Sequence, residues 1–333
     1  MQPNSLTRFK KNKRGYASFL ILSAIFILTL LAELIANDKP LLVRFNGEFC
    51  FPIFHSVPET NFGGEFETAT DFRDPQVQQL IKENGWLIFP LIPFSYDTIN
   101  YDVTSPAPSK PTFSNLLGTD DSGRDVLARV IYGIRVSLIF GLTLTFFSAV
   151  LGIFLGAIQG YFGGLCDLIL QRFMEIWSSM PVLFLLIILS SIIEPSFFTL
   201  LGLMLLFSWM SLVGYVRAEF LRLRNFDFVR ASKALGASNF RIIFRHILPN
   251  ASPIIIANLP FLLAGSITTL TSLDFMGLGL PIGSPSLGEL LAQGKNNLTA
   301  YWLGISGFVL ITTLLTLLVF IGEAMRDAFD TRK

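Results

Sequence analysis

Six mostly apolar stretches divide the chain, each close to the roughly 20 residues that an α-helix needs to cross a bilayer. Short polar segments separate them, apart from one long segment after the first stretch. The pattern predicts an all-α membrane protein with six transmembrane helices. The predicted spans are Tyr16–Ile35, Val136–Ile158, Ile176–Ile193, Phe197–Val216, Ser252–Leu270 and Trp302–Ile321.

The composition supports a membrane protein. Hydrophobic residues make up 52% of the 333 residues and charged residues 15%, against about 25% charged in soluble domains. The net charge of +1 gives no electrostatic case for nucleic-acid binding. Cys50 and Cys166 fall on opposite predicted membrane faces, which argues against a disulfide framework. His55 and His246 are far from each other and from both cysteines, so no zinc ligand set is expected.

The basic residues predict the orientation. Residues 1–15 form a basic N-terminus before the first span, and that span is too long for a signal-peptide core and lacks a cleavage site. The positive-inside rule therefore places both termini in the cytoplasm. The other predicted cytoplasmic charges are Arg217, Arg222, Arg224, Arg230, Lys233, Arg241 and Arg245 in the segment 217–251, and Arg326, Arg332 and Lys333 in the tail.

The long segment 36–135 is predicted to be an outer, periplasmic insertion. It holds nine of the 17 prolines, so much of it is expected to be irregular. One short helix is predicted, with Asp74 as N-cap, Pro75 in the first position and Gly85 as its end. The apolar cluster 86–94 favours a small packed lobe, and a loop lying on the membrane surface is the alternative.

The predicted spans carry no ionisable residue near mid-membrane, since Glu33, Glu194 and Asp274 lie at span ends or just beyond them. Ion-driven carriers usually keep such a group. The motifs of common catalytic and nucleotide sites are missing as well. The sequence therefore predicts no catalytic residue, and energy for any transport has to come from another subunit.

Glycines at 152, 156, 160 and 164 recur every four residues along the second span and its exit. Small residues at this spacing are typical of tight helix packing. A substrate path along the same stripe is the second interpretation.

The segment 217–251 predicts two helices beneath the membrane. Asp227 can cap the first and Gly236 can end it in a left-handed turn. Ser238 can cap the second, and Pro249 is expected to end it. The second helix has an apolar face of Phe240, Ile243, Phe244 and Ile247. Docking onto a partner and lying on lipid both fit this pattern.

This segment resembles the "EAA" loop of permease subunits in binding-protein-dependent ABC importers. Arg230-Ala231-Ser232, then Gly236, then Leu248-Pro249 occupy the slots of that pattern. Arg230 replaces the usual acidic residue and His246 an isoleucine. Both departures, with Arg245 to Asn250 reading R-H-I-L-P-N, are similar to the di/oligopeptide branch.

Further motifs resemble the same branch. They are Leu117 to Asp125 (L-G-T-D-D-S-G-R-D), Gly160 to Gly164 followed by Asp167 (G-Y-F-G-G-x-x-D), and Phe275 to Gly279 (F-M-G-L-G). With the long insertion, the stretch 284–297 is similar to the E-type permeases of Yej oligopeptide importers.

The resemblance implies a type I ABC importer permease fold, with a core at 136–333. It implies inner-membrane import of oligopeptides, including peptide antibiotics such as microcin C. The implied partners are a second homologous permease, an ABC ATPase of two chains or one fused chain that holds ATP-Mg, and a periplasmic peptide-binding protein. This chain itself is expected to need no cofactor. The expected ATPase-coupling residues are Arg230, Ala231, Ser232, Ala234, Leu235, Gly236, Ser238 and Phe240.

A second candidate site is the predicted outer mouth of the second span, with Asp120, Gly123, Arg124 and Asp125. These residues could dock or gate with the binding protein, or could form a capped turn with an internal ion pair. Serine and threonine hydroxyl groups in the spans could donate hydrogen bonds to a substrate, but the sequence assigns none of them to this role.

Two alternatives from other classes remain open. One is an assembly subunit without a transport path. The other is a membrane enzyme with its active site in the outer lobe, where nothing in the spacing orients the candidate groups. These groups are His55, Glu59, Glu65, Glu67 and Asp71.

Overall fold

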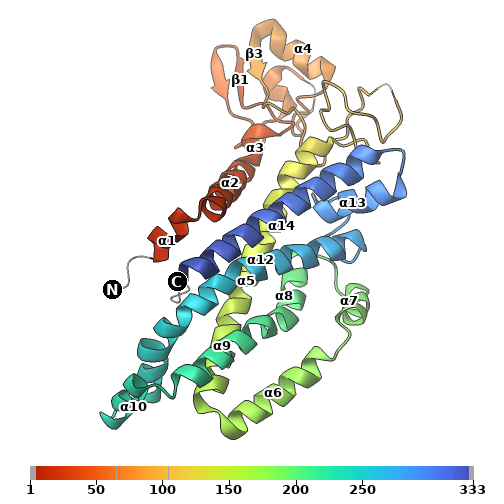
Figure 1. Ribbon diagram of the computed structural model, residues 1–333. Coiled ribbons are helices and arrows are strands. Elements are labelled where there is room, and N and C mark those ends of the chain that lie inside the picture. The colour runs from red at the N-terminus through yellow and green to blue at the C-terminus, as the bar shows by residue number, and fades with distance from the viewer. Residues whose placement is uncertain (1–4, 65, 104, 330–333) are drawn as a thin grey trace. The chain divides into compact units, whose positions relative to one another are not determined.

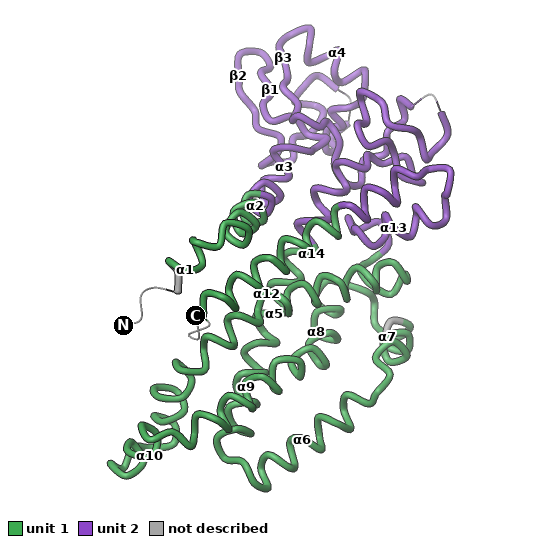
Figure 2. Tube along the Cα trace, viewed as in Figure 1, with its two compact units in different colours: residues 1–24, 137–281, 310–333 green, residues 25–136, 282–309 purple. Residues whose placement is uncertain are grey.

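The computed structural model of the chain describes residues 5–329, except residues 65 and 104. Most of it is helical (Figure 1), and it divides into two compact units (Figure 2). Unit 1 comprises residues 1–24, 137–281 and 310–333, and unit 2 comprises residues 25–136 and 282–309. Glu65, Arg332 and Lys333, which the sequence analysis singles out, lie outside the described residues.

Three long helices run through both units, namely α2 (Lys13–Leu30), α5 (Val126–Phe162) and α14 (Tyr301–Phe329). The other elements of unit 1 are α1 (Ser5–Lys11), α6 (Gly164–Ser178), α7 (Val182–Ser190), α8 (Phe197–Ser208), α9 (Met210–Leu223), α10 (Asp227–Ala234), α11 (Asn239–Arg241), the π-helix η2 (Ile242–Ile247) and α12 (Leu248–Phe275). The other elements of unit 2 are α3 (Ala32–Ile35), β1 (Leu42–Phe45), β2 (Glu48–Cys50), the 3-10 helix η1 (Glu59–Phe62), α4 (Pro75–Asn84), β3 (Gly85–Ile88) and α13 (Leu287–Asn296).

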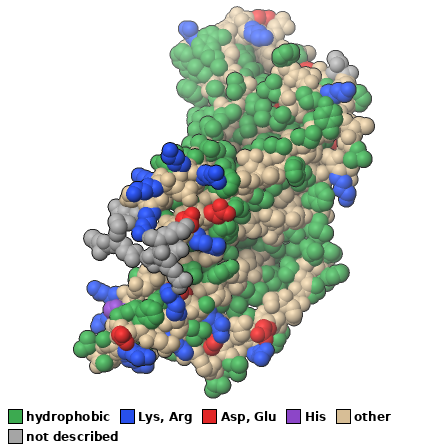
Figure 3. All heavy atoms as spheres, in the orientation of Figure 1, with side chains coloured by type: hydrophobic (Ala, Val, Ile, Leu, Met, Phe, Trp, Pro, Cys, Tyr) green, Lys and Arg blue, Asp and Glu red, His purple; other side chains and the backbone are tan. Residues whose placement is uncertain are grey.

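The apolar helices reach the predicted number of six spans only if one bent pair of helices is counted as a span. Within the described residues, five helices are long and apolar enough to cross a membrane, and a bent pair raises the number to six. These helices carry broad exposed apolar surface, part of which is visible in Figure 3. Several helices extend beyond the predicted bounds, because polar and basic residues at their ends remain helical.

The bounds predicted for the third span are wrong. Instead of one helix over Ile176–Ile193, α6 and α7 meet at a break and differ in direction by 64°. The break falls at Ser179, Met180 and Pro181. The ring of Pro181 disfavours helical backbone at Met180 and removes an amide donor, so a continuous helix is costly here.

The glycine stripe packs α5 closely against α9. A Cβ atom at Gly152 or Gly156 would lie 2.9 Å or less from atoms of α9 and of the residue before it. Gly160 leaves as little room, next to Phe220, whereas Gly164 has open space around it. The first three glycines therefore allow close helix approach, as the packing interpretation predicts.

The lobe within unit 2 has a small hydrophobic core rather than being a loose loop. Its sheet has the order β2-β1-β3, with both strand pairs antiparallel, and Val43 lies opposite Cys50 and Leu87. The turn between β1 and β2 is Asn46-Gly47, both with positive φ. The sequence analysis did not predict these strands. The buried core residues are Val43, Val57, Phe62, Phe72, Val77 and Ile81.

The one helix predicted in this lobe is confirmed as α4. The Asp74 side chain accepts a hydrogen bond of 2.8 Å from the Gln76 amide, and Pro75 takes the first helical position. Gly85 follows the helix with extended backbone, so it is no left-handed stop. A Cβ atom there would collide with the Arg44 carbonyl on β1, so glycine is required for close strand pairing.

Candidate functional site

The segment 217–251 in unit 1 contains the predicted turn between two helices. α10 ends at Ala234, and Gly236 has φ +80°. The Leu235 amide donates to the Ala231 carbonyl at 3.0 Å, and the Ala237 amide donates to the Ser232 carbonyl at 3.1 Å. These bonds satisfy the last carbonyls of α10 and need the left-handed backbone that glycine adopts without strain. The predicted role of Gly236 as the helix stop is confirmed.

Of the two predicted helix caps, one is confirmed and one is wrong. The Ser238 side chain accepts the Arg241 amide at 3.4 Å, so Ser238 caps α11 as predicted. Asp227 is not the cap of α10, because the last extended residue is Phe226 and the helix begins at Asp227 itself. Its carboxylate still lies in the first turn, where negative charge is favourable.

Pro249 does not end the second helix, contrary to the prediction. A continuous helical path runs from Asn239 to Phe275, and Pro249 lies near the start of α12. The preceding residues Ile242–Ile247 form a π-helix. This wider winding changes the hydrogen-bond partners ahead of Pro249, so its missing amide and bulky ring do not break the chain.

The turn presents a mixed small and apolar surface. Leu235 is 88% exposed and Phe240 71% exposed, far more than large apolar side chains usually are. Ser232 is half-buried and donates to the Phe228 carbonyl at 2.8 Å. The exposed predicted coupling residues are Arg230, Ala231, Ala234, Leu235, Gly236, Ser238 and Phe240. The structure thus brings all eight candidates to one short helix–turn–helix.

The predicted apolar face of the second helix is divided. Ile243 and Ile247 are buried in a core that also contains Val229 of α10. Phe240 and Phe244 are exposed instead, and their ring centroids lie 4.4 Å apart. The inward residues fix the turn on the helices, while the outward aromatic pair remains available to a partner surface.

The second candidate site, in unit 2, is a tight turn with a buried ion pair. The Asp120 carboxylate accepts the Ser122 and Arg124 amides at 3.0 and 2.9 Å, and Arg124 Nε lies 2.8 Å from it. Gly123 has φ +82° and is buried. This geometry is that of a capped turn with an internal ion pair. Its neighbours Asp121 and Ser122 are the exposed residues of the turn.

Asp125 connects this turn to α5. Its carboxylate accepts the Ala128 amide at 2.8 Å, which caps the helix, and the Asn115 side-chain amide at 2.7 Å. Burial raises the pKa of this carboxyl above its ordinary value, although these two hydrogen bonds oppose the shift.

Sequence reasoning missed two members of the same network. Arg129 is fully buried, donates to the Ser284 carbonyl at 3.0 Å, and lies 2.9 Å from the carboxylate of Glu289 on α13. Its Nε lies 3.4 Å from Asp120. Two arginines and two carboxylates therefore form one neutral cluster. The sequence did offer one signal for Arg129, since it follows Asp125 by one helical turn. The prediction missed it because the second span was taken to begin at Val136, whereas α5 begins at Val126.

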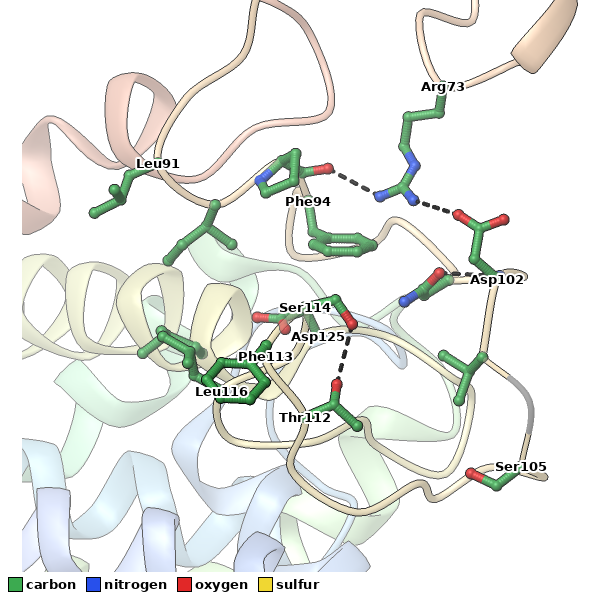
Figure 4. Close-up of a pocket in the computed structure, with 15 residues that line it drawn as sticks. Arg73, Leu91, Phe94, Asp102, Ser105, Thr112, Phe113, Ser114, Leu116 and Asp125 are labelled. Atoms are coloured by element: carbon green, nitrogen blue, oxygen red, sulfur yellow. Dashed lines mark hydrogen bonds and ion pairs between the residues drawn. The ribbon is translucent and has the colours of Figure 1, made fainter.

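A cavity of about 550 Å³ lies beside this turn in unit 2 (Figure 4). Arg73 donates to the Pro93 carbonyl at 2.9 Å, pairs with Asp102 at 3.2 Å, and lies over the Phe94 ring. Phe113 and Leu116 form part of an apolar wall. The charged side chains that line the cavity are thus already partnered within unit 2, so the cavity identifies no ligand.

The hydroxyl groups of the spans are also partly used in packing. Thr145 lies 3.4 Å from Ser266, and Ser148 lies 2.5 Å from Ser208, oxygen to oxygen. Residues 5–329, without 65 and 104, contain no group of three or more His, Cys, Asp or Glu side chains that could hold a metal ion.

The apolar helices of spanning length indicate a multi-pass membrane protein. The chain belongs to the family of binding-protein-dependent transport system inner membrane components, whose sequence profile matches residues 148–333. The resemblance found in the sequence is therefore confirmed. The family consists of permeases and not of catalytic subunits, and the enzyme alternative has no support.

Full-length relatives agree with this assignment. The chain is 56% identical to the inner membrane ABC transporter permease protein YejE of Escherichia coli K12, over 98% of this chain and 96% of the relative. It is 54% identical to the peptidoglycan transport system permease protein YejE of Agrobacterium fabrum, over 98% and 91%. It is 38% identical to the oligopeptide transport system permease protein OppC of Lactococcus lactis subsp. lactis, over 67% and 77%.

A solved structure supports the fold. The inward-facing MetNI methionine ABC transporter aligns with a TM-score of 0.51 and 19% identity, over 61% of this chain and 97% of that chain. This likeness confirms the predicted fold of a type I ABC importer permease. The chain is mostly helical rather than all-α, because unit 2 contains the three-stranded sheet β2-β1-β3. The chain is a multi-pass inner-membrane protein.

Proposed function

We propose that this chain forms one half of the membrane path of an ATP-driven importer of oligopeptides. A second, homologous permease forms the other half, and a periplasmic peptide-binding protein delivers the cargo. Both termini and the segment 217–251 face the cytoplasm, whereas residues 36–135 form a periplasmic insertion. Relatives named for oligopeptide and peptidoglycan transport support a cargo that contains short peptides. Uptake of microcin-type peptides stays a prediction.

The observation that carries this proposal is the exposed helix–turn–helix on a firmly packed base. Leu235 and Phe240 project from the turn, while Val229, Ile242 and Ile247 anchor it in the core of unit 1. An ATPase with bound ATP-Mg would seat this surface in a groove. Its closure would then move helices α9 and α12 as rigid bodies and expose the path to alternate sides.

The peptide path is proposed to bind its cargo by hydrogen bonds rather than fixed charge. The outer turn with Asp120, Gly123, Arg124 and Asp125 is proposed to shape the periplasmic mouth, because its charges are neutralised internally and only neighbouring residues are exposed.

The proposal is tested by uptake of a radiolabelled tripeptide into cells that lack the chain and carry it on a plasmid. Leu235→Asp places a charge in the proposed docking surface and is expected to lower uptake about 10-fold or more, through loss of ATPase contact. Phe54→Asp changes a similarly exposed apolar residue of unit 2 and is the matched control. If the Leu235→Asp variant took up the tripeptide as fast as the wild type, the proposed docking surface would be wrong. If the wild-type chain supported no tripeptide uptake, the proposed peptide cargo would be wrong.

A further inference from the structure

Residues 160–167 connect the end of α5 to the start of α6. Side chains on both sides of the docking turn, before α10 and at the start of α11, make polar contacts with this connection. From one end, Tyr161 donates its hydroxyl hydrogen bond to the Asn239 side-chain oxygen at 2.7 Å. Asn239 is the first residue of α11, directly after the cap Ser238. A side chain of α5 therefore holds the start of the second docking helix.

From the other end, Arg224 follows the last residue of α9 and leads toward α10. Its guanidinium donates to the carbonyls of Gly160 and Tyr161 at 3.3 and 3.4 Å. Gly163 has φ +63°, and a Cβ atom there would collide with the same guanidinium. The glycine thus gives Arg224 the space to reach the end of α5.

A third contact reaches α6. Arg217 of α9 forms a two-pronged ion pair with Asp167, with N–O distances of 2.5 and 2.7 Å. α6 has no buried residue along its described length. Another polar contact of α6 is the hydrogen bond that the Trp177 indole donates to the Leu206 carbonyl of α8 at 2.9 Å. The ion pair therefore gives this lightly packed helix a charged contact to α9.

Apolar packing continues beneath these contacts. Phe220 of α9, Val229 of α10 and Ile242 of η2 belong to one buried cluster, and Tyr161 and Ala237 pack against it. The docking helices are therefore joined to the end of α5 by both apolar packing and polar contacts, so a displacement of these helices would also move α5.

We propose that Tyr161, Asp167, Arg217, Arg224 and Asn239 form a polar joint that transmits movement of the docking helices to α5 and α6. The joint rests on the proposed function, since it needs an ATPase to move the docking helices. It assigns a role to the G-Y-F-G-G-x-x-D motif, in which glycines make room and Tyr161 and Asp167 make the contacts. These are positioning residues, because they are proposed to act on the path through helices α5 and α6.

A native thiol provides the readout. Cys166 is a free, half-buried cysteine next to Asp167 at the start of α6. In a Cys50→Ser background it is the single cysteine of this chain. The complex purified through this chain is labelled with a maleimide, with and without a non-hydrolysable ATP analogue. The ratio of the two labelling rates measures ATP-driven movement at the joint and cancels any direct effect of a substitution on the thiol.

Three variants test the joint. Tyr161→Phe removes one hydroxyl group, Arg217→Asp breaks the ion pair, and Arg217→Asp with Asp167→Arg restores it in reverse. The matched control exchanges the charges of Arg172 and Glu175, an exposed ion pair on the same helix without a contact to the docking segment.

We expect the wild-type ratio to differ from one by about 5-fold or more, as for ordinary coupled sites. Tyr161→Phe and Arg217→Asp should bring it close to one, the reversed pair should recover most of it, and the control should keep it. A wild-type ratio of one, or an unchanged ratio in both single variants, would overturn the joint. Loss of the ATPase from the Tyr161→Phe complex would overturn it in favour of a docking role.

The outcome is separable from that of the proposed function. A normal labelling response without tripeptide uptake by the wild-type complex would contradict the proposed cargo and leave the joint standing. Tripeptide uptake with no effect of the joint variants on the labelling ratio would contradict the joint alone.

Discussion

The left-handed backbone of Gly236 makes a quantitative prediction about the docking turn. At φ +80°, a residue with a Cβ atom costs about 1–2 kcal/mol. No atom lies within 4 Å of a Cβ atom built at this position, so the cost is one of backbone conformation and not of collision within the chain. Such a cost lowers the population of the turn about 5- to 30-fold.

Substitutions at Gly236 can separate backbone strain from steric interference with a partner. Asparagine tolerates left-handed backbone better than alanine, although its side chain is larger. Backbone strain therefore predicts that coupling falls in the order Gly, Asn, Ala and Val. Steric interference with a bound ATPase predicts that alanine is tolerated better than asparagine.

The assay is peptide transported per ATP hydrolysed by the purified complex in proteoliposomes. Gly202→Ala, at a helical glycine with equally open surroundings, is the control. We expect Gly236→Ala and Gly236→Val to lower the transport ratio, with Gly236→Asn in between. Alanine at or above the asparagine value would refute the argument from backbone strain.

Two further predictions concern packing in each unit. Gly156→Ala would place a Cβ atom 2.7 Å from Val216, and overpacking should cost about 1–3 kcal/mol, seen as a lower melting temperature than that of Gly202→Ala. An unchanged melting temperature would contradict the tight α5–α9 contact. Arg129→Met removes one of the two cations from the neutral cluster in unit 2 and leaves Arg124 alone with the carboxylates of Asp120 and Glu289, so that one largely buried negative charge is unbalanced. The loss should cost about 3–5 kcal/mol and reduce the amount of folded protein in membranes. The exposed Asp121→Asn should stay within about 0.5 kcal/mol of wild type, and equal behaviour of both variants would argue against the buried network.

The sequence was most informative where one local rule decides the backbone. The cap and proline of α4, the turn at Gly236 and the cap at Ser238 each depend on contacts within a few residues. The apolar spans were visible for a similar reason, since lipid imposes a simple length and composition. These features agree between the sequence and the structure.

The sequence predictions failed where the backbone next to a proline or glycine decides whether a helix continues, bends or is replaced by a strand. Pro249 was expected to end a helix, but the π-helix before it accommodates the ring. Pro181 was expected to lie inside a span, but the chain bends there by 64°. The expectation of mostly irregular structure in the proline-rich segment was wrong for β1 and β2, whose connection Asn46-Gly47 is a strong hairpin signal.

The networks could not be found from spacing along the chain. Arg129 meets Glu289 across 160 residues, and Tyr161 meets Asn239 across 78. Such pairs depend on helix packing that one sequence does not specify. The motifs did identify neighbouring residues, since Asp125 and Gly160 lie within four residues of Arg129 and Tyr161, respectively.

Residues 230–240 are proposed to dock this permease onto an ATPase. The most direct test is purification of the tagged chain from native membranes in mild detergent, with its partners identified by mass spectrometry, beside a variant in which these residues are scrambled. We expect an ATPase and a second permease with the wild type, and loss of the ATPase alone with the variant. Recovery of the ATPase with the scrambled variant, or of a homo-oligomer without any ATPase from the wild type, would contradict it.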